Sequence, residues 1–258
     1  MVLPASLSLG LAGALGPDLV AALAPAAEEA GFATLWVNDT PSGDAVAALA
    51  AAATVTDRIG LATGVVPLDR REPDSLVSAL QAADLPAGRL TVGIGSGSAP
   101  SHQLALVERG IEALRAGVPG AQVVVGALGP RMRRLATSVA DGQLLNWLTP
   151  DAAAAQRDPD SRTILYVRTA LDAAALPRLL AEADAYAGYP AYAANFARLG
   201  FSARDTVIGS LDDAARVMAY RAAVDEVVLR VIVERDDPGH YLDFIRTAAA
   251  ALIDADAS

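Results

Sequence analysis

The chain contains no cysteine and no lysine, since all 20 of its basic residues are arginine. Without cysteine there is no disulfide, no thiolate nucleophile and no ligand for an iron–sulfur cluster. Without lysine there is no amine for a Schiff base, for anchoring pyridoxal phosphate or for a Walker P-loop. These absences exclude several classes of enzyme in which a protein side chain carries the difficult chemistry.

Histidine is almost as scarce, because the chain has only His102 and His240. A metal site with several histidines is therefore excluded, and we expect no metal centre. We interpret both residues as belonging to the first turns of helices; an acid–base role is the alternative for His102, which follows a glycine-rich loop. If the protein is an enzyme, a bound cofactor is expected to supply the chemistry.

Net charge and hydropathy narrow the range of partners. The net charge of -10 disfavours nucleic acid, whose binding depends on cationic contacts to phosphates. The longest apolar run, Ala45–Val55, is too short for a membrane span, which needs about 20 residues. Met1–Gly16 is uncharged and lacks the basic start of a signal peptide, so we interpret it as strand and loop. We expect a soluble cytoplasmic protein that acts on a small molecule.

Short runs of valine, isoleucine and leucine alternate with alanine-rich or amphipathic segments, as in buried parallel strands separated by helices. The expected strands are Ala5–Leu11, Thr34–Val37, Ile59–Val66, Leu90–Ile94, Gln122–Val125, Gln143–Trp147, Thr163–Arg168 and Glu226–Val233. Eight such strands in about 250 residues predict an α/β fold, a closed (β/α)8 TIM barrel; an open doubly wound sheet is the alternative. We expect one domain over residues 1–258, with extra helices within Ala170–Val224. Asp44, Asp74 and Ser101 are the expected helix N-caps.

A glycine-rich loop follows the fourth expected strand. In Gly88–Ser98 an apolar strand enters a loop in which alternate residues are glycine. Glycine permits a positive φ, and it also removes the Cβ that would keep a flat ligand from the backbone. Similar strand ends occur at Ala62–Val65 and Gly126–Pro130. Because strand ends of one polarity form the active site of such a barrel, these loops predict a single cofactor cradle.

The segment Gly126–Arg134 is a candidate anion site. A strand ends in glycine, and Pro130 then opens a helix whose first turns hold three arginines. Free amides and the positive end of the helix dipole attract phosphate. A simple turn followed by a solvated basic helix face is the alternative.

Three further strand ends carry polar or aromatic residues. Asp39 follows Asn38 and can hydrogen-bond a heterocycle or relay a proton; a turn or helix-capping aspartate is the commoner case. Asn146–Trp147 can line the mouth of the site, or can pack as a buried pair. We interpret Arg70–Arg71 as surface residues that pair with neighbouring Asp69 or Glu72.

Read together, these motifs resemble the bacterial luciferase-like flavin oxidoreductases, and most closely their deazaflavin-dependent branch. The similar blocks are Ala27–Asp39, Ala51–Val65, Ala87–Gly97 and Gly126–Pro150. The resemblance implies a (β/α)8 barrel that binds the deazaflavin coenzyme F420, or FMN, at its mouth. It also implies a non-prolyl cis peptide at Gly64–Val65 beneath the ring, and a phosphate held by Leu128–Met132.

The resemblance thus implies a set of site residues. Asp39 and Asn38 are the expected catalytic residues, orienting the ring or relaying a proton. The expected cofactor-binding residues are Asp39, Thr63, Gly64, Val65, Gly95, Ser96, Gly97, Ala127, Leu128, Gly129, Pro130, Arg131, Met132 and Asn146.

Two departures from the family pattern concern the substrate side. Thr40 stands where the deazaflavin enzymes often carry histidine, and the insertion after the fourth strand is short. The expected activity is hydride transfer between coenzyme F420 and a small organic substrate. An FMN-dependent monooxygenase and a catalytically silent flavin-binding barrel are the alternatives. Family members are often homodimers, so we expect a homodimer.

Overall fold

Eight parallel strands close into a barrel in the order of the chain, with each strand hydrogen-bonded to its sequence neighbours and β1 to β8. The computed structural model describes residues 5–253. The strands are β1 Ser6–Ala12, β2 Thr34–Asn38, β3 Gly60–Pro67, β4 Leu90–Gly95, β5 Gln122–Gly126, β6 Gly142–Asn146, β7 Arg162–Thr169 and β8 Glu226–Val231. The predicted (β/α)8 barrel is confirmed, and the open sheet is excluded.

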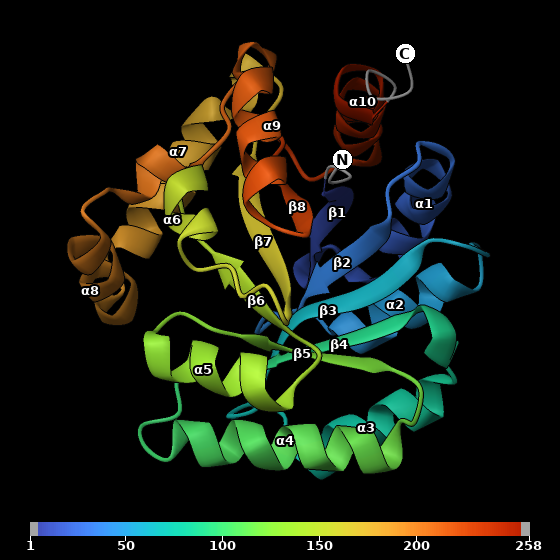
Figure 1. The fold of residues 1–258 in the computed structure, drawn as a ribbon. Helices are drawn as coiled ribbons and strands as arrows, with labels where there is room; N and C mark the ends of the chain where they lie inside the picture. Colours follow the sequence, from blue (N-terminus) through green and yellow to red (C-terminus); the bar gives the residue numbers. More distant parts are fainter. Residues whose placement is uncertain (1–4, 254–258) are drawn as a thin grey trace.

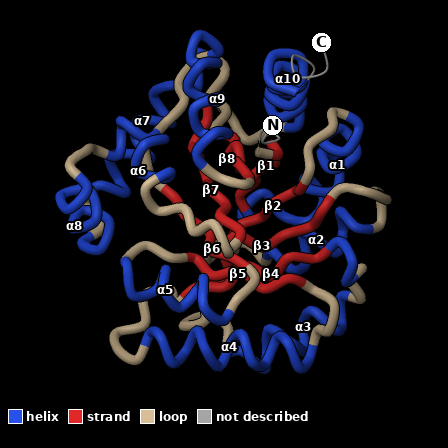
Figure 2. The backbone as a smooth tube through the Cα atoms, in the orientation of Figure 1, coloured by secondary structure: helices blue, strands red, loops and turns tan. Residues whose placement is uncertain are grey.

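Helices surround the barrel, as the blue outer layer around the red strands shows (Figure 2). They are α1 Gly16–Glu29, α2 Ala45–Ala53, α3 Pro73–Ala83, α4 Gln103–Gly117, α5 Pro130–Val139, α6 Pro150–Ala154, α7 Leu176–Ala187, α8 Pro190–Leu199, α9 Ala214–Ala223 and α10 Pro238–Ala248. Short 3-10 turns occupy Gly13–Leu15, Ala87–Arg89, Ala173–Ala175, Ala203–Thr206 and Leu211–Asp213, and a π turn occupies Ala249–Ile253. The expected single domain of 1–258 also includes residues 1–4 and 254–258, which lie outside the described residues.

One connection is longer than the others. Between β7 and β8 the chain adds α7 and α8, which pack on each other and lie on one flank of the barrel (Figure 1). The expected extra helices are therefore present. Between β4 and β5 the structure has α4 as its one α-helix, in agreement with the predicted short insertion.

Of the three predicted helix N-caps, one is confirmed and two are wrong. Asp44 caps α2, since its carboxylate accepts hydrogen bonds from the amides of Val46 and Ala47. The prediction for Asp74 is wrong: Pro73 takes the first helical position, so the cap is Glu72. The prediction for Ser101 is also wrong, because α4 begins after His102, whose φ is 53°.

Two hydrophobic layers hold the barrel together. The larger layer lies between strands and helices and includes Leu9, Leu35 and Leu229, all fully buried. The smaller fills the barrel interior with Trp36, Ala62, Val124, Leu144, Ile164, Tyr166 and Val228. Because strand side chains alternate between faces, the residues two positions further along these strands lie at the mouth of the barrel.

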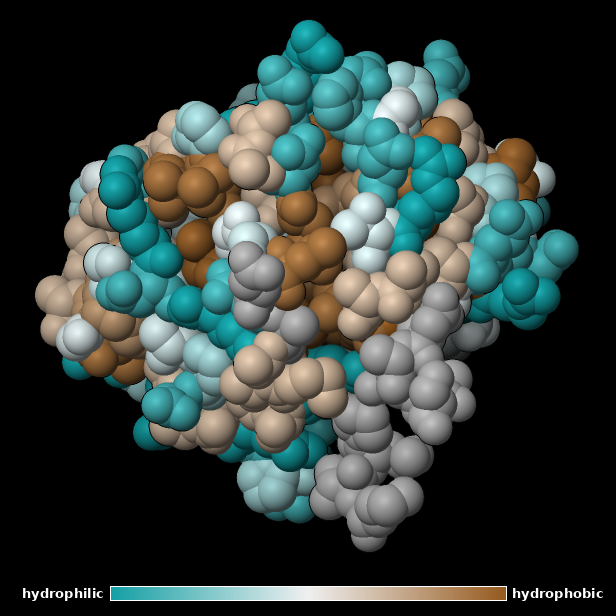
Figure 3. Space-filling view, turned by 90° about the horizontal axis from the view of Figure 1, so that it is seen from above, coloured by the Kyte–Doolittle hydropathy of each residue, from teal (hydrophilic) through white to brown (hydrophobic). Residues whose placement is uncertain are grey.

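One face of the molecule carries a mixture of hydrophobic and hydrophilic residues. Seen from above, brown hydrophobic residues alternate with teal hydrophilic ones (Figure 3). None of the described helices is both long enough and apolar enough to cross a bilayer.

Candidate active site

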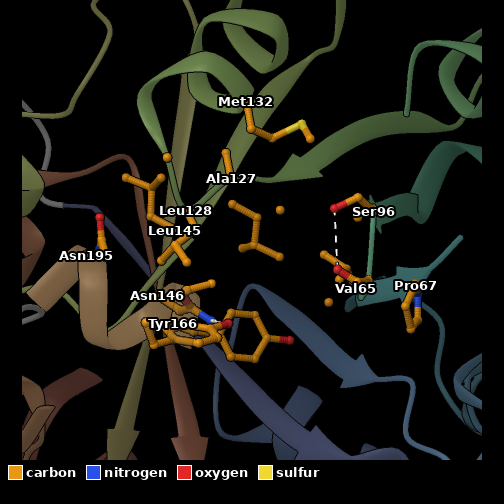
Figure 4. A pocket seen from close by; sticks show the side chains of 18 of the residues that line it. Val65, Pro67, Ser96, Ala127, Leu128, Met132, Leu145, Asn146, Tyr166 and Asn195 are labelled. Carbon is orange, nitrogen blue, oxygen red and sulfur yellow. Dashed lines mark hydrogen bonds between the residues drawn. The ribbon is translucent and has the colours of Figure 1, made fainter. Parts of the chain in front are cut away.

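A cavity of about 610 Å³ opens at the carboxyl ends of the strands, where (β/α)8 barrels carry their active sites. Its walls come from the carboxyl ends of strands β2 to β8 and from helices α7 and α8. Val65, Pro67 and Ser96 lie on one side and Asn146, Tyr166 and Asn195 on the other, with Ala127 and Met132 above (Figure 4). The dimensions suit a small-molecule ligand.

The β3 end bulges into this cavity. The peptide between Gly64 and Val65 is cis, as the family resemblance implied, and the pairing of β3 with β4 shifts register between Thr63 and Val66. A Cβ on Gly126 would lie 2.9 Å from Val65 Cγ1, and one on Gly95 would lie 3.1 Å from Val65 Cγ2. Glycine at both positions therefore makes room for the Val65 side chain.

The glycine-rich loop after β4 has a different reason for its glycines. Gly97 has a φ of 59°, and any Cβ there would collide with the carboxylate of Asp69. That carboxylate accepts a hydrogen bond of 2.8 Å from the amide of Ser98. The glycine thus lets Asp69 hold the loop, and its backbone lies in the cavity wall together with Gly95 and Ser96.

The start of α5 forms another wall. Gly129 is the N-cap, so no side chain caps the first turn, and the amides of Arg131 and Met132 have no intrahelical acceptor. A Cβ built on Gly129 meets no atom within 4 Å. This combination of open space and free amides at a helix N-terminus fits a phosphate.

Two guanidinium groups strengthen the positive potential beside this helix start. Arg198 of α8 lines the cavity and donates a hydrogen bond to Asn195 Oδ1. Burial, and next the charge of Arg198, lower the pKa of Arg133 below its ordinary value. The Nε of Arg133 is buried without a hydrogen-bond partner among residues 5–253.

Asp39 lines the cavity, but its carboxylate is already engaged. Oδ1 accepts a hydrogen bond of 3.0 Å from Arg70, and Oδ2 accepts one of 3.3 Å from the amide of Ala45. The predicted pairing of Arg70 and Arg71 is wrong, because Arg71 pairs with Asp44 instead. Both arginines therefore reach across to the loop after β2.

Most of the predicted site residues come together at the cavity. Those that line it are Asn38, Asp39, Gly64, Val65, Gly95, Ser96, Gly97, Ala127, Leu128, Gly129, Met132 and Asn146. Thr63 does not, since its hydroxyl donates to Gly93 O and accepts from Gly93 N inside the barrel wall. Pro130 and Arg131 lie on the exposed side of α5, so their contribution is limited to the backbone.

The two histidines lie elsewhere. His102 is exposed before α4, and His240 in the first turn of α10 contacts Asp237. Neither lines the cavity.

Sequence reasoning missed the β7, β8 and α7–α8 side of the site. The missed residues that line the cavity include Tyr166, Arg168, Tyr186, Tyr192, Asn195, Arg198 and Arg230. A signal was available for two of them. Tyr166 and Arg168 follow Ile164 at intervals of two in an apolar strand, which places them on the interior face near its carboxyl end.

The α8 side of the cavity is held by aromatic contacts. Asn146 donates a hydrogen bond of 3.2 Å to the hydroxyl of Tyr192, and the rings of Tyr186 and Tyr192 meet edge to face at 5.0 Å. Trp147 packs against Tyr186 at 4.7 Å. These contacts position α7 and α8 beside the barrel mouth.

Several buried polar atoms in the cavity wall have no hydrogen-bond partner among the described residues. They are Asn38 Oδ1, Tyr166 Oη, Arg168 Nη1 and Asn195 Nδ2. Buried polar groups in native proteins are normally satisfied, so these atoms require partners from solvent or from a ligand in the cavity.

The comparisons with known proteins agree with this geometry. Residues 2–111 match the family model described as luciferase-like monooxygenase. The match spans 110 of the 258 residues, less than half of the chain, and agrees with the luciferase-like resemblance over that part. A putative coenzyme F420-dependent oxidoreductase of Mycobacterium tuberculosis is 38% identical over 90 residues, which are 34% of this chain and 26% of that protein. The chain therefore matches about a quarter of the length of this curated relative.

Several solved structures superpose on nearly the whole chain. An F420-dependent secondary alcohol dehydrogenase in complex with an F420–acetone adduct superposes with a TM-score of 0.75 at 14% identity, over 97% of this chain and 98% of that one. The oxygenating constituent of 3,6-diketocamphane monooxygenase from Pseudomonas putida, in complex with FMN, has a TM-score of 0.68 at 13% identity, over 95% and 97%. At these identities the likeness shows the shared fold.

Proposed function

We propose that the chain is an oxidoreductase that transfers a hydride between coenzyme F420 and a small organic substrate. The observation that carries this proposal is the cavity itself. Its floor is the Val65 bulge flanked by Gly95 and Gly126, and its wall is the uncapped start of α5. The matched relative and one solved neighbour, both named as F420-dependent, support the choice of cofactor.

The residues divide between the ring and the anionic tail of this cofactor. Val65 and the backbone at Gly95–Gly97 are proposed to lie against the ring, and the amides at Leu128–Met132 to bind the phosphate. A bound deazaflavin supplies a carbon that accepts or donates a hydride. The chain's own task is to bind, to orient and to exclude water.

The roles of Asn38 and Asp39 differ in this arrangement. Asn38 has a buried Oδ1 without a protein partner, so we propose that it accepts a hydrogen bond from the ring edge. Asp39 is held by Arg70 and by the amide of Ala45. We therefore propose that Asp39 keeps the loop after β2 in place beside the ring.

An FMN-dependent monooxygenase is the second candidate, since one solved neighbour holds FMN and the family model is described as luciferase-like monooxygenase. Titration of the purified protein with coenzyme F420 and with FMN, followed by absorbance and calorimetry, separates the two. We expect saturable F420 binding at least about tenfold tighter than FMN binding. Tighter binding of FMN would support the monooxygenase, and no binding of either would contradict both proposals.

Assembly and location are separate proposals, and the dimer rests on the family resemblance. We propose a homodimer in the cytoplasm. Size-exclusion chromatography with light scattering tests the dimer, and a mass of one chain would contradict it.

The hydroxyl of Tyr166 offers a test that separates binding from stability. Tyr166→Phe removes a buried hydroxyl that has no protein partner, so the free energy of unfolding should change by less than about 0.5 kcal/mol. Ligand affinity at the cavity should fall about tenfold, because the hydroxyl is proposed to bond the ligand. Urea unfolding and cofactor titration measure the two effects.

Tyr220→Phe is the matched control. Its hydroxyl is buried and lies within hydrogen-bond distance of two carbonyl oxygens, Leu148 O at 2.9 Å and Thr206 O at 3.0 Å, which share its one proton. This variant should lose about 1 kcal/mol of stability and keep its cofactor affinity. Equal stability losses in both variants would contradict the assignment of Tyr166.

A further inference from the structure

Two arginines end neighbouring strands on the interior face of the barrel. Arg168 of β7 and Arg230 of β8 are register partners, and both line the cavity. Tyr166 and Val228 precede them by two residues on the same face. Like charges directly opposite each other on paired strands are unfavourable, so such a pair calls for a compensating anion.

Arg168 is held rigidly, and part of it has no partner. Its side chain is only 8% exposed, and its Nε donates a hydrogen bond of 3.1 Å to Glu182. The guanidinium carbon lies 4.2 Å from the Trp147 ring and 4.9 Å from the Tyr186 ring. These contacts leave Nη1 buried without an acceptor in the part of the chain that the structure describes. An unmade hydrogen bond to a buried charged group is costly, which favours an acceptor supplied by a ligand.

Arg230 adds a second positive charge at the same place. Its Nη1 donates to the carbonyl of Val231, and no carboxylate of residues 5–253 forms an ion pair with it. Glu182 is thus the one acidic ion-pair partner of the two guanidinium groups within the described chain. The charge of Arg230 also acts on the nearby carboxylates of Glu182 and Asp236, although neither forms an ion pair with it among the described residues. Both guanidinium groups line the cavity, where an anion would complete their pairing.

The surroundings favour an anion on a flat organic body. The rings of Tyr166, Tyr186 and Tyr192 line the cavity beside the arginines. Guanidinium forks match the planar geometry of a carboxylate, and aromatic walls pack against a flat or apolar body.

We propose that Arg168 and Arg230 bind the carboxylate of the substrate, so that the substrate is an organic acid with an aromatic or other flat body. This inference rests on the proposed function, because it names the substrate of the same cavity. The amides proposed for the cofactor phosphate follow β5, whereas the two arginines end β7 and β8. The substrate anion and the cofactor anion thus have separate sites.

Benzoate and its neutral analogue benzamide are suitable probes. Calorimetric titration of the full-length protein, with and without saturating coenzyme F420, should show benzoate binding and at least about tenfold weaker benzamide binding. Arg230→Met should weaken benzoate binding at least about tenfold and leave benzamide binding unchanged. Arg204→Met is the matched control, since Arg204 forms an exposed ion pair with Asp184. It should bind benzoate as the unmodified protein does.

Arg168→Lys provides a second variant, because it keeps the charge beside Glu182 while removing the planar fork. We expect intermediate benzoate affinity. Equal affinity for benzoate and benzamide, or unchanged benzoate affinity in Arg230→Met, would overturn the proposal. So would a loss of F420 affinity in Arg230→Met without a loss of benzoate affinity, because the arginines would then serve the cofactor. Failure of the proposed function is a different result, namely no F420 binding by the unmodified protein while benzoate binding persists.

Discussion

Gly129→Glu is expected to lower cofactor affinity by about a hundredfold or more. The new carboxylate would occupy the uncapped start of α5, where the phosphate is proposed to bind, and would also accept the free amides there. Placing like charges together in a binding site costs several kcal/mol, and each 1.4 kcal/mol corresponds to a tenfold change in affinity. Titration with coenzyme F420 measures the loss.

The fold should tolerate this substitution. The φ of Gly129 is -95°, which any residue can adopt, and its Cβ would meet no atom within 4 Å. Gly129→Gln is the matched control, because it has the same size and no charge. We expect the glutamine variant to retain much more affinity than the glutamate variant. Unchanged affinity in Gly129→Glu would show that the phosphate lies elsewhere.

Glu226→Ala is expected to destabilise the barrel by about 3 kcal/mol. Glu226 begins β8 and is 1% exposed inside the barrel. Its Oε1 accepts hydrogen bonds from Ser8 Oγ and Trp36 Nε1, and its Oε2 pairs with Arg162. Removing the carboxylate leaves two buried donors unsatisfied, each of which costs about 1–3 kcal/mol. Urea unfolding at pH 7 measures the change.

Two controls separate the buried network from charge alone. Glu226→Gln keeps an acceptor for Ser8 and Trp36, so it should lose less stability than the alanine variant. Asp184→Ala breaks an exposed ion pair with Arg204 and should leave the urea midpoint unchanged. If Glu226→Ala unfolds at the same urea concentration as the unmodified protein, the network does not support the barrel.

The strands could be predicted from the sequence because each one is buried on both faces. Runs such as Gln122–Val125 and Leu90–Ile94 are largely apolar, as parallel strands buried on both faces require, so they predict strands clearly. Their ends were less certain, and β8 ends at Val231 rather than Val233. A helix cap was predictable where no neighbouring residue favoured a different helix start. Asp44 met this condition, whereas Pro73 took the first helical position beside Asp74 and moved the cap to Glu72.

The glycines show the limit of a motif. Gly95 and Gly97 were both expected to admit a flat ligand, and both do lie in the cavity wall. Their glycine identity has other causes: Gly95 faces Val65, and Gly97 faces Asp69. A glycine motif indicates that a side chain does not fit at a position. The atoms that exclude the side chain here, in Val65 and Asp69, lie about 30 residues earlier in the chain.

The sequence by itself determined the barrel and the loops at the carboxyl ends of β2 to β6. Those features depend on local patterns of apolar residues, glycines and helix starts, and each pattern lies within a short continuous segment. Only the tertiary structure decided which charges meet. Closure of the barrel sets Arg168 beside Arg230, and α7 brings Glu182 into an ion pair with Arg168. Pairing across distant segments depends on register and packing, and neither can be read from the spacing of residues along the chain.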